Sequence, residues 1–114
     1  MKVLVCGGRD FDNFSFLSDE LDKIGITHLI HGGAEGADTL AGEWAYMNNI
    51  ICTRYPALWH IYGKSAGPMR NQQMLDHGRP DLVVAFPGGK GTAHMVSIAK
   101  KANVKVIEID DIQT

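Results

Sequence analysis

The sequence predicts a single α/β domain, a three-layer sandwich in which helices cover both faces of a mostly parallel five-stranded sheet. Strand-like and helix-like segments alternate along the whole chain, which is the pattern that builds parallel sheets through right-handed crossovers. Three of the strands also run straight into glycine-rich turns. With 114 residues there is room for one core, so we expect residues 1–114 to form one domain.

The expected strands are short runs of β-branched and aliphatic residues. They cover residues 2–6, 28–31, 50–55, 81–86 and 104–109. For five strands joined by helices, the Rossmann-like order 3-2-1-4-5 is the natural expectation. That order puts strands 1 and 4 side by side at the switch point, and ligands bind beyond the carboxyl ends of the strands there. All three glycine turns fall at this edge.

Four helices are expected between the strands. They cover residues 14–24, 37–48, 68–77 and 93–102. Apolar residues recur at intervals of three and four in the first two, and Gly25 ends the first. Pro68 fits the first turn of the third, which stops at Gly78.

Segment 56–67 has no such pattern and is expected to be a long irregular loop. It holds aromatic residues and Lys64, and a loop of this length in a compact domain is more often functional than idle. We expect Trp59 and Lys64 to cover a base or sugar, with Gly63 and Gly67 as hinges. The alternative is that Trp59 anchors the loop onto the core.

Composition and charge narrow the class of protein. Hydrophobic residues make up 45% of the chain, as in ordinary globular domains, and the formal net charge of -2 disfavours nucleic acid as a partner. No apolar run approaches the roughly 20 residues that span a bilayer, and no signal-peptide pattern is present. Cys6 and Cys52 lie in apolar strands and are expected to be buried, reduced thiols. We therefore expect a cytoplasmic protein with no membrane partner.

The turn over residues 86–92, Phe-Pro-Gly-Gly-Lys-Gly-Thr, is the strongest functional signal. Glycines let the backbone approach an anion, and the N-terminus of the following helix adds a favourable dipole. The expected phosphate contacts are Gly88, Gly89, Gly91 and Thr92, with Thr92 also able to cap the helix. The spacing is neither a Walker A motif nor the dinucleotide GxGxxG fingerprint. The alternative is a tight strand–helix connection without a ligand.

The first strand leads into a second glycine turn, formed by Gly7 and Gly8 and followed by Arg9. A guanidinium at this position suits bidentate recognition of a phosphate. The alternative for Arg9 is a surface ion pair with Asp10, of small energetic value.

The second strand leads into Gly32, Gly33 and, at the start of the next helix, Asp38. Asp38 is expected either to stabilise the first turn of that helix or to contact a ribose hydroxyl. Arg70 and Asn71 lie in the first turn of a later helix, where a cation opposes the helix dipole, so both are candidate ligand-binding residues. The alternative for Arg70 is an ordinary solvated side chain.

No catalytic set can be assembled from the residues alone. The five histidines lack metal-ligand spacing, so neither a metal nor a cofactor is expected. His31 is expected to satisfy a backbone group at its strand end, whereas His94 is expected to face the site. Arg70, His94 and Glu35 remain catalytic candidates if the protein is an enzyme.

Together these motifs resemble the SLOG superfamily, and specifically its small YspA-related branch. The resemblance rests on five segments in order, at residues 7–11, 32–38, 55–59, 66–71 and 86–92. It implies a Rossmann-like fold that binds a nucleotide or an NAD- or ADP-ribose-derived ligand. It also implies kinship with the cytokinin-activating phosphoribohydrolases and with DprA-type DNA-processing proteins.

The phosphoribohydrolases share the Pro-Gly-Gly-x-Gly-Thr turn and an upstream arginine, which Arg70 matches. Their turn is followed by an acidic pair, and here His94 and Met95 stand in its place. Without those carboxylates the same hydrolytic mechanism is disfavoured. We therefore expect ligand binding, by sensing or sequestration. A nucleoside-monophosphate phosphoribohydrolase or N-glycosidase is the alternative, and single-stranded nucleic-acid binding is the third reading.

Trp44, Tyr46 and Met47 on one helix suggest a homodimer, although packing on the sheet explains Trp44 and Met47 nearly as well.

Overall fold

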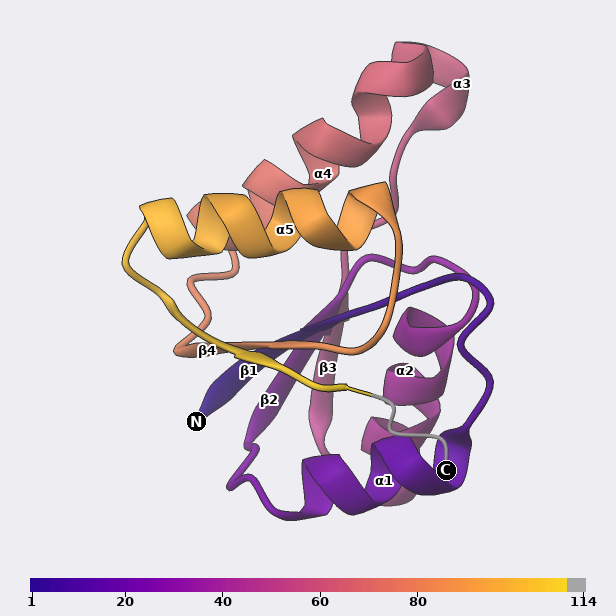
Figure 1. Ribbon diagram of the computed structural model, residues 1–114, viewed down its shortest axis with the longest axis vertical. Helices are drawn as coiled ribbons and strands as arrows, with labels where there is room; N and C mark the ends of the chain where they lie inside the picture. The colour runs from indigo at the N-terminus through magenta and orange to yellow at the C-terminus, as the bar shows by residue number, and fades with distance from the viewer. Residues whose placement is uncertain (111–114) are drawn as a thin grey trace.

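The computed structural model describes residues 1–110 and forms one five-stranded, all-parallel sheet with the strand order β3-β2-β1-β4-β5 (Figure 1). The strands are β1 (Lys2–Cys6), β2 (His28–His31), β3 (Ile51–Arg54), β4 (Leu82–Ala85) and β5 (Lys105–Glu108). The α/β fold class and the predicted strand order are both confirmed. β1 and β2 have the expected bounds, and each of the other three strands is one residue shorter at both ends.

Helices form a layer on each face of the sheet. They are α1 (Phe14–Asp22), α2 (Ala37–Met47), α3 (Trp59–Tyr62), α4 (Ala66–Asp76) and α5 (Lys90–Lys101), with a 3-10 turn at Gly63–Ser65. Figure 1 shows α1 and α2 together below the sheet and α4 and α5 together above it. The sheet thus separates two apolar clusters, one against each pair of helices.

The centre of the sheet is the best-buried part of the fold. β1 and β4 pair in register from Val3 with Leu82 to Cys6 with Ala85, and all four residues of β4 are buried. Strands buried on both faces explain why these segments read as continuous apolar runs. This pairing brings the turns after β1 and β4 to the same edge.

The prediction of a long irregular loop over residues 56–67 is wrong. The segment contains α3 and the 3-10 turn, and α4 begins at Ala66, two residues before Pro68. These short helical turns form an arm that projects from the body beyond the first turn of α5 (Figure 1). These helical turns were not predicted, because the aromatic residues of the segment are neighbours in the sequence and its apolar residues do not recur at helical spacing.

Helix α5 begins three residues earlier than expected, at Lys90. Gly89 is its N-cap residue and no side chain caps the helix, so Thr92 lies inside the first turn and the expected capping role is wrong. The helix start was not predicted at Lys90 because Gly89 and Gly91 flank it, and glycine is a poor helix former.

The expectation that both cysteines are buried is wrong for Cys52, and Trp44 follows the alternative of packing in the core. Cys6 is buried, but Cys52 is exposed, because β3 is an edge strand. Trp44 is only 4% exposed, and its Nε1 donates a hydrogen bond to Asp22 Oδ1 at 2.9 Å. Tyr46 and Met47 do remain exposed. Across residues 1–110 we find no helix with the length and apolar character needed to cross a membrane.

Candidate functional site

A cavity of about 920 Å³ opens at the carboxyl ends of β1 and β4, where the turns after these strands meet α4 and the arm. Its size falls in the range typical of small-molecule sites. Eleven of the predicted ligand-binding residues line it, together with the catalytic candidate His94. The eleven are Gly7, Gly8, Arg9, Asp38, Trp59, Arg70, Asn71 and the turn residues Gly88, Gly89, Gly91 and Thr92.

Backbone hydrogen bonds lock the three glycine turns together. The Gly8 N–H donates to the carbonyl of Pro87 at 2.8 Å, and the Gly8 carbonyl accepts from Ala37 N–H at 3.1 Å. The turn after β1 is therefore held between the turn after β4 and the start of α2. This bonding fixes the rim of the cavity without the help of a side chain.

Some of the glycines are required by this close approach. A Cβ on Gly8 would lie 2.9 Å from the Pro87 carbonyl oxygen, and one on Gly36, where φ is +80°, would collide with the Gly8 backbone. Gly89 and Gly91 are different, because an added Cβ would meet nothing within 4 Å at either position, and neither has a positive φ. Packing gives no reason for glycine at these two positions on the cavity wall.

The first turn of α5 leaves backbone donors free at the cavity. The first amide of this turn with a partner along the described chain is that of Ala93, which donates to the Gly89 carbonyl at 3.0 Å. No side chain caps the helix, and Gly89, Lys90, Gly91 and Thr92 all line the cavity. Unpaired amides at a helix N-terminus attract anions.

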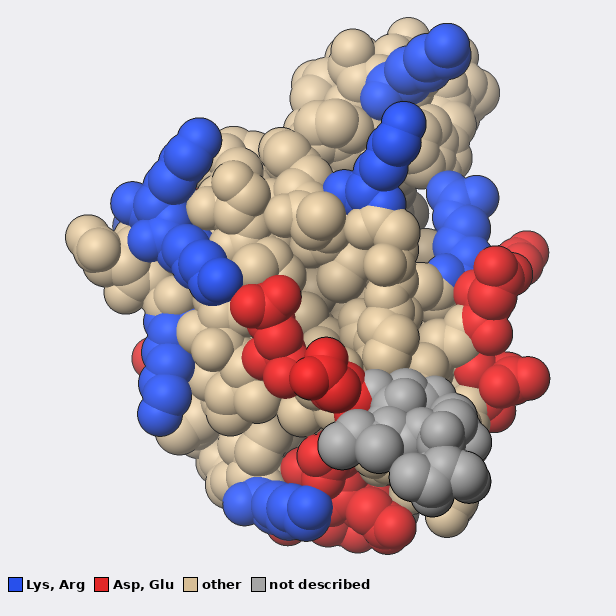
Figure 2. Space-filling model, viewed as in Figure 1, with Lys and Arg blue, Asp and Glu red and all other residues tan. Residues whose placement is uncertain are grey.

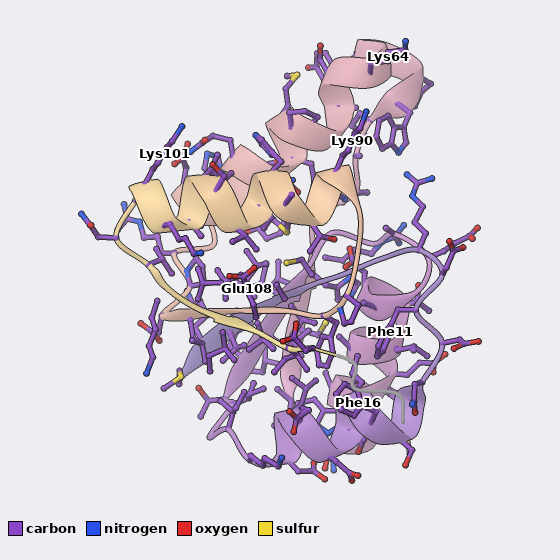
Figure 3. The ribbon with its side chains drawn as sticks, in the orientation of Figure 1. Phe11, Phe16, Lys64, Lys90, Lys101 and Glu108 are labelled. Atoms are coloured by element: carbon purple, nitrogen blue, oxygen red, sulfur yellow. The ribbon has the colours of Figure 1, made fainter. Side chains whose placement is uncertain are left out.

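Arginine and lysine side chains from three elements surround this helix start. Arg9 follows β1, Arg70 lies on α4, and Lys90 is the first residue of α5. Figure 3 shows Lys90 at the open end of the helix, next to the arm, and Figure 2 shows basic side chains gathered around this end of α5. The cavity therefore combines a helix N-terminus with three cations, although the whole chain is slightly acidic.

Arg70 is held by the protein rather than solvated. Its Nη1 donates to the Gly32 carbonyl oxygen and its Nε to Asn71 Oδ1, the latter at 3.0 Å. Burial lowers the pKa of Arg70, and the nearby Asp38 carboxylate opposes that shift. A fixed, partly buried guanidinium is pre-organised for an oxyanion.

Asp38 is buried, and its Oδ2 accepts hydrogen bonds from the Gly32 N–H at 3.0 Å and the Ala34 N–H at 3.2 Å. Burial raises the pKa of Asp38, while the Ala34 hydrogen bond and Arg70 pull it down. The carboxylate thus shapes the turn after β2 in addition to lining the cavity, and its role differs from simple stabilisation of the first turn of α2.

The remaining polar side chains form a chain of contacts into α5. Asn71 is buried, and its Nδ2 donates to the Gly91 carbonyl at 3.2 Å and contacts His94 Nδ1 at 3.1 Å. All three residues line the cavity. The sequence had identified Asn71 and His94 separately, whereas their direct contact appears only in the structure.

Trp59 forms the wall on the arm side. It is 47% exposed, its ring lies under the Arg9 guanidinium at 5.7 Å, and its Cη2 atom is 3.0 Å from where a Gly67 Cβ would be. The indole therefore contacts both the body and α4 while one side stays open to the cavity. Arg9 makes this cation–π contact, and within residues 1–110 the ion pair with Asp10, which was the alternative to ligand contact, does not form.

Four of the predicted site residues lie outside the cavity lining. Gly32 supports the site from behind through Arg70 and Asp38, and Gly33 lies beside Arg54 at φ +75°. Glu35 is exposed on the turn after β2, and Lys64 lies on the far end of the arm (Figure 3). His31 Nδ1 accepts from the Gly33 N–H at 3.0 Å, as expected.

Several lining residues were missed from the sequence. They include Cys6, Asp10, Phe11, Asp12, Met74 and Lys90. Cys6 ends β1 next to the glycine turn, a position that could have identified it, and burial raises the pKa of its thiol to about 12. Asp10 and Asp12 also follow that turn, so one rim of the cavity is acidic. In the part of the chain that the structure describes, no group of three or more His, Cys, Asp or Glu side chains is placed to hold a metal ion.

Two comparisons with known proteins identify relatives of this chain. The YspA, cpYpsA-related SLOG family matches residues 1–62, which include β1, β2 and the turns that follow them. The chain is also similar to the Gene 61 protein of Mycobacterium phage D29, with 36% identity over 123 aligned positions that cover 96% of this chain and 97% of the phage protein. The chain therefore belongs to the YspA, cpYpsA-related SLOG family, as the order of its five motifs had indicated.

Proposed function

We propose that the cavity binds a nucleotide-type ligand, with its phosphate on the first turn of α5. Membership of the SLOG family suggests a nucleotide-related role. The observation that carries the proposal is the pair Gly89 and Gly91, which line the cavity where neither packing nor backbone conformation requires glycine. A ligand oxygen that binds the free backbone amides would explain why both positions are glycine, because a side chain there would block its approach.

The other lining groups suit the rest of a nucleotide. Arg70 and Lys90 neutralise the phosphate, and the open side of Trp59 accepts a base by stacking. The two amide contacts of Asp38 both use Oδ2, so Oδ1 remains available to a ribose hydroxyl. A cavity of about 920 Å³ has room for an NAD- or ADP-ribose-derived ligand, which the protein would sense or sequester.

Calorimetry with ADP-ribose, NAD⁺, AMP and inorganic phosphate tests this proposal. We expect at least one nucleotide to bind more tightly than phosphate alone. Mass spectrometry of small molecules released from the heat-denatured protein should identify the same class of ligand. If no nucleotide in the panel binds and none is released, the proposal is wrong.

The alternative is a phosphoribohydrolase or N-glycosidase that acts on a nucleoside monophosphate. One observation favours it: Asp10 and Asp12 bring carboxylates to the cavity, although the acidic pair expected after the turn is replaced by His94 and the buried Met95. Release of free base from AMP, lost in Arg70→Ala, would support the enzyme. Oligonucleotide affinity that falls steeply with salt would support the third reading, single-stranded nucleic-acid binding.

A further inference from the structure

The side chain of Asn71 has its hydrogen-bonding orientation fixed by its neighbours. Arg70 Nε–H can only donate, so the Asn71 atom 3.0 Å from it is the carbonyl Oδ1. The Gly91 carbonyl can only accept, so the atom facing it at 3.2 Å is the amide Nδ2. Two independent partners therefore assign the same orientation to this buried amide.

This orientation determines the state of His94. The amide nitrogen of Asn71 has no lone pair to offer, so its second N–H donates to His94 Nδ1 across 3.1 Å. A proton on Nδ1 would point at the amide hydrogens of Asn71. Nδ1 must therefore be the bare nitrogen, and the proton of the neutral ring lies on Nε2.

The position of His94 directs this donor toward the proposed phosphate. His94 is the fifth residue of α5 and lines the cavity. Side chains on a helix lean toward its N-terminus, so the ring lies over the first turn, which carries the free amides. Among residues 1–110, Nε2 has no protein partner.

We propose that Asn71 is a positioning residue that holds His94 as the Nε2–H tautomer, so that His94 donates a hydrogen bond to a phosphate oxygen of the ligand. The ligand part of this inference rests on the proposed function, whereas the tautomer is a property of the free protein. It also bears on catalysis: with Nδ1 occupied and Nε2 protonated, the neutral ring has no lone pair for a proton from the cavity. His94 is then a binding donor and not a general base.

Long-range ¹H–¹⁵N correlation spectra of the imidazole nitrogens test the tautomer without any ligand. The spectra are recorded well above the ordinary histidine pKa of about 6.5, with His94 assigned by its loss in His94→Gln. We expect the Nε2–H pattern in the wild type. In Asn71→Asp the new carboxylate can only accept, so His94 should change to the Nδ1–H or doubly protonated pattern.

Gln72→Glu makes the same amide-to-acid change at the next residue of α4, which is exposed, and should leave the His94 pattern unchanged. A wild-type Nδ1–H pattern, or an unchanged pattern in a folded Asn71→Asp protein, would overturn the inference. If Asn71→Asp fails to fold, the wild-type spectrum still decides.

ADP-ribose affinity tests the ligand part. We expect His94→Leu to weaken binding at least about tenfold, and His94→Gln, which keeps an N–H donor, to recover part of the loss. Equal affinity in all three proteins would overturn the phosphate contact. If the wild-type protein does not bind ADP-ribose, the phosphate contact to this ligand is wrong. The tautomer is tested separately, by the imidazole spectrum of the free protein.

Discussion

Arg70 and Gly32 are joined by a hydrogen bond from the guanidinium Nη1 to the backbone carbonyl oxygen, although 38 residues separate them in the chain. The bond connects α4 to the turn after β2, across the sheet edge where the cavity opens. The same guanidinium donates to Asn71 and lies close enough to Asp38 to influence its pKa. Arg70 therefore supports the site as well as offering it a charge.

Replacing Arg70 should damage both stability and binding. In Arg70→Ala the Gly32 carbonyl and Asn71 Oδ1 lose their donor, which we expect to cost about 1–3 kcal/mol in the free energy of unfolding. Nucleotide affinity should fall below detection by calorimetry. Lys101→Ala removes the same charge at the opposite end of α5 and should affect neither property (Figure 3). Unchanged affinity in a folded Arg70→Ala protein would contradict the assignment.

Gly89→Asp should abolish nucleotide binding and leave the fold intact. The new Cβ enters open space, so the melting temperature should stay near that of the wild type, but the carboxylate occupies the anion position. Gly25→Asp is the matched control, because a Cβ there also meets nothing within 4 Å and the position is remote from the cavity lining. Calorimetry and thermal melts on both variants separate charge at the site from charge elsewhere.

Trp59→Ala should weaken nucleotide binding by about 1–3 kcal/mol if the indole stacks on a base. Tyr62→Ala, on the same helical turn and equally exposed at 47%, lies outside the cavity lining and should leave affinity unchanged. Because Trp59 also packs near Gly67, melting temperatures must be measured alongside. A lower melting temperature with unchanged affinity would show that Trp59 only anchors the arm.

His31 should make the protein sensitive to acid. Burial lowers its pKa to about 4, against about 6.5 in an unfolded chain, so the unfolded state binds the extra proton between these values. The stabilisation is complete above pH 6.5 and is lost as the pH falls toward 4, a difference of roughly 3 kcal/mol. In His31→Gln, whose carbonyl oxygen can still accept from Gly33, denaturant titrations should show a flatter pH dependence. The exposed His60→Gln should keep the wild-type slope.

The homodimer remains a prediction and now rests on fewer residues. Trp44 belongs to the core, whereas Tyr46 and Met47, 85% and 67% exposed, stay available together with Ile51 on the edge strand. Light scattering at micromolar concentration should give a two-chain mass that Tyr46→Glu reduces to one chain. A wild-type monomer would refute the prediction.

The sheet was predictable because its signals are local. Buried parallel strands read as short apolar runs, and alternation with helices left few possible orders. The start of α5 and the arm were not predictable, since glycines at 89 and 91 break the helix pattern and the turns around Trp59 carry no period. Both segments also line the cavity, and departures from local sequence rules are most often found at functional or strained sites.

Most of the predicted site residues converge, because every one taken from a strand–turn junction shares the same sheet edge. Contacts between side chains could not be predicted from the sequence. Nothing in the sequence indicates that Asn71 contacts His94, or that Gly32 serves the site from behind Arg70 rather than from the cavity wall. Such pairs depend on how α4 packs against α5 and on the turn after β2.

Arg70 and Asn71 are consecutive residues, yet one is bonded to the turn after β2 and the other to α5. Detaching the beginning of α4 would break both connections at once, so the cavity should assemble and come apart as a unit rather than wall by wall. Ligand binding and retention of α4 are then thermodynamically linked. Bound nucleotide should slow amide hydrogen exchange in α4 even at residues that never touch it.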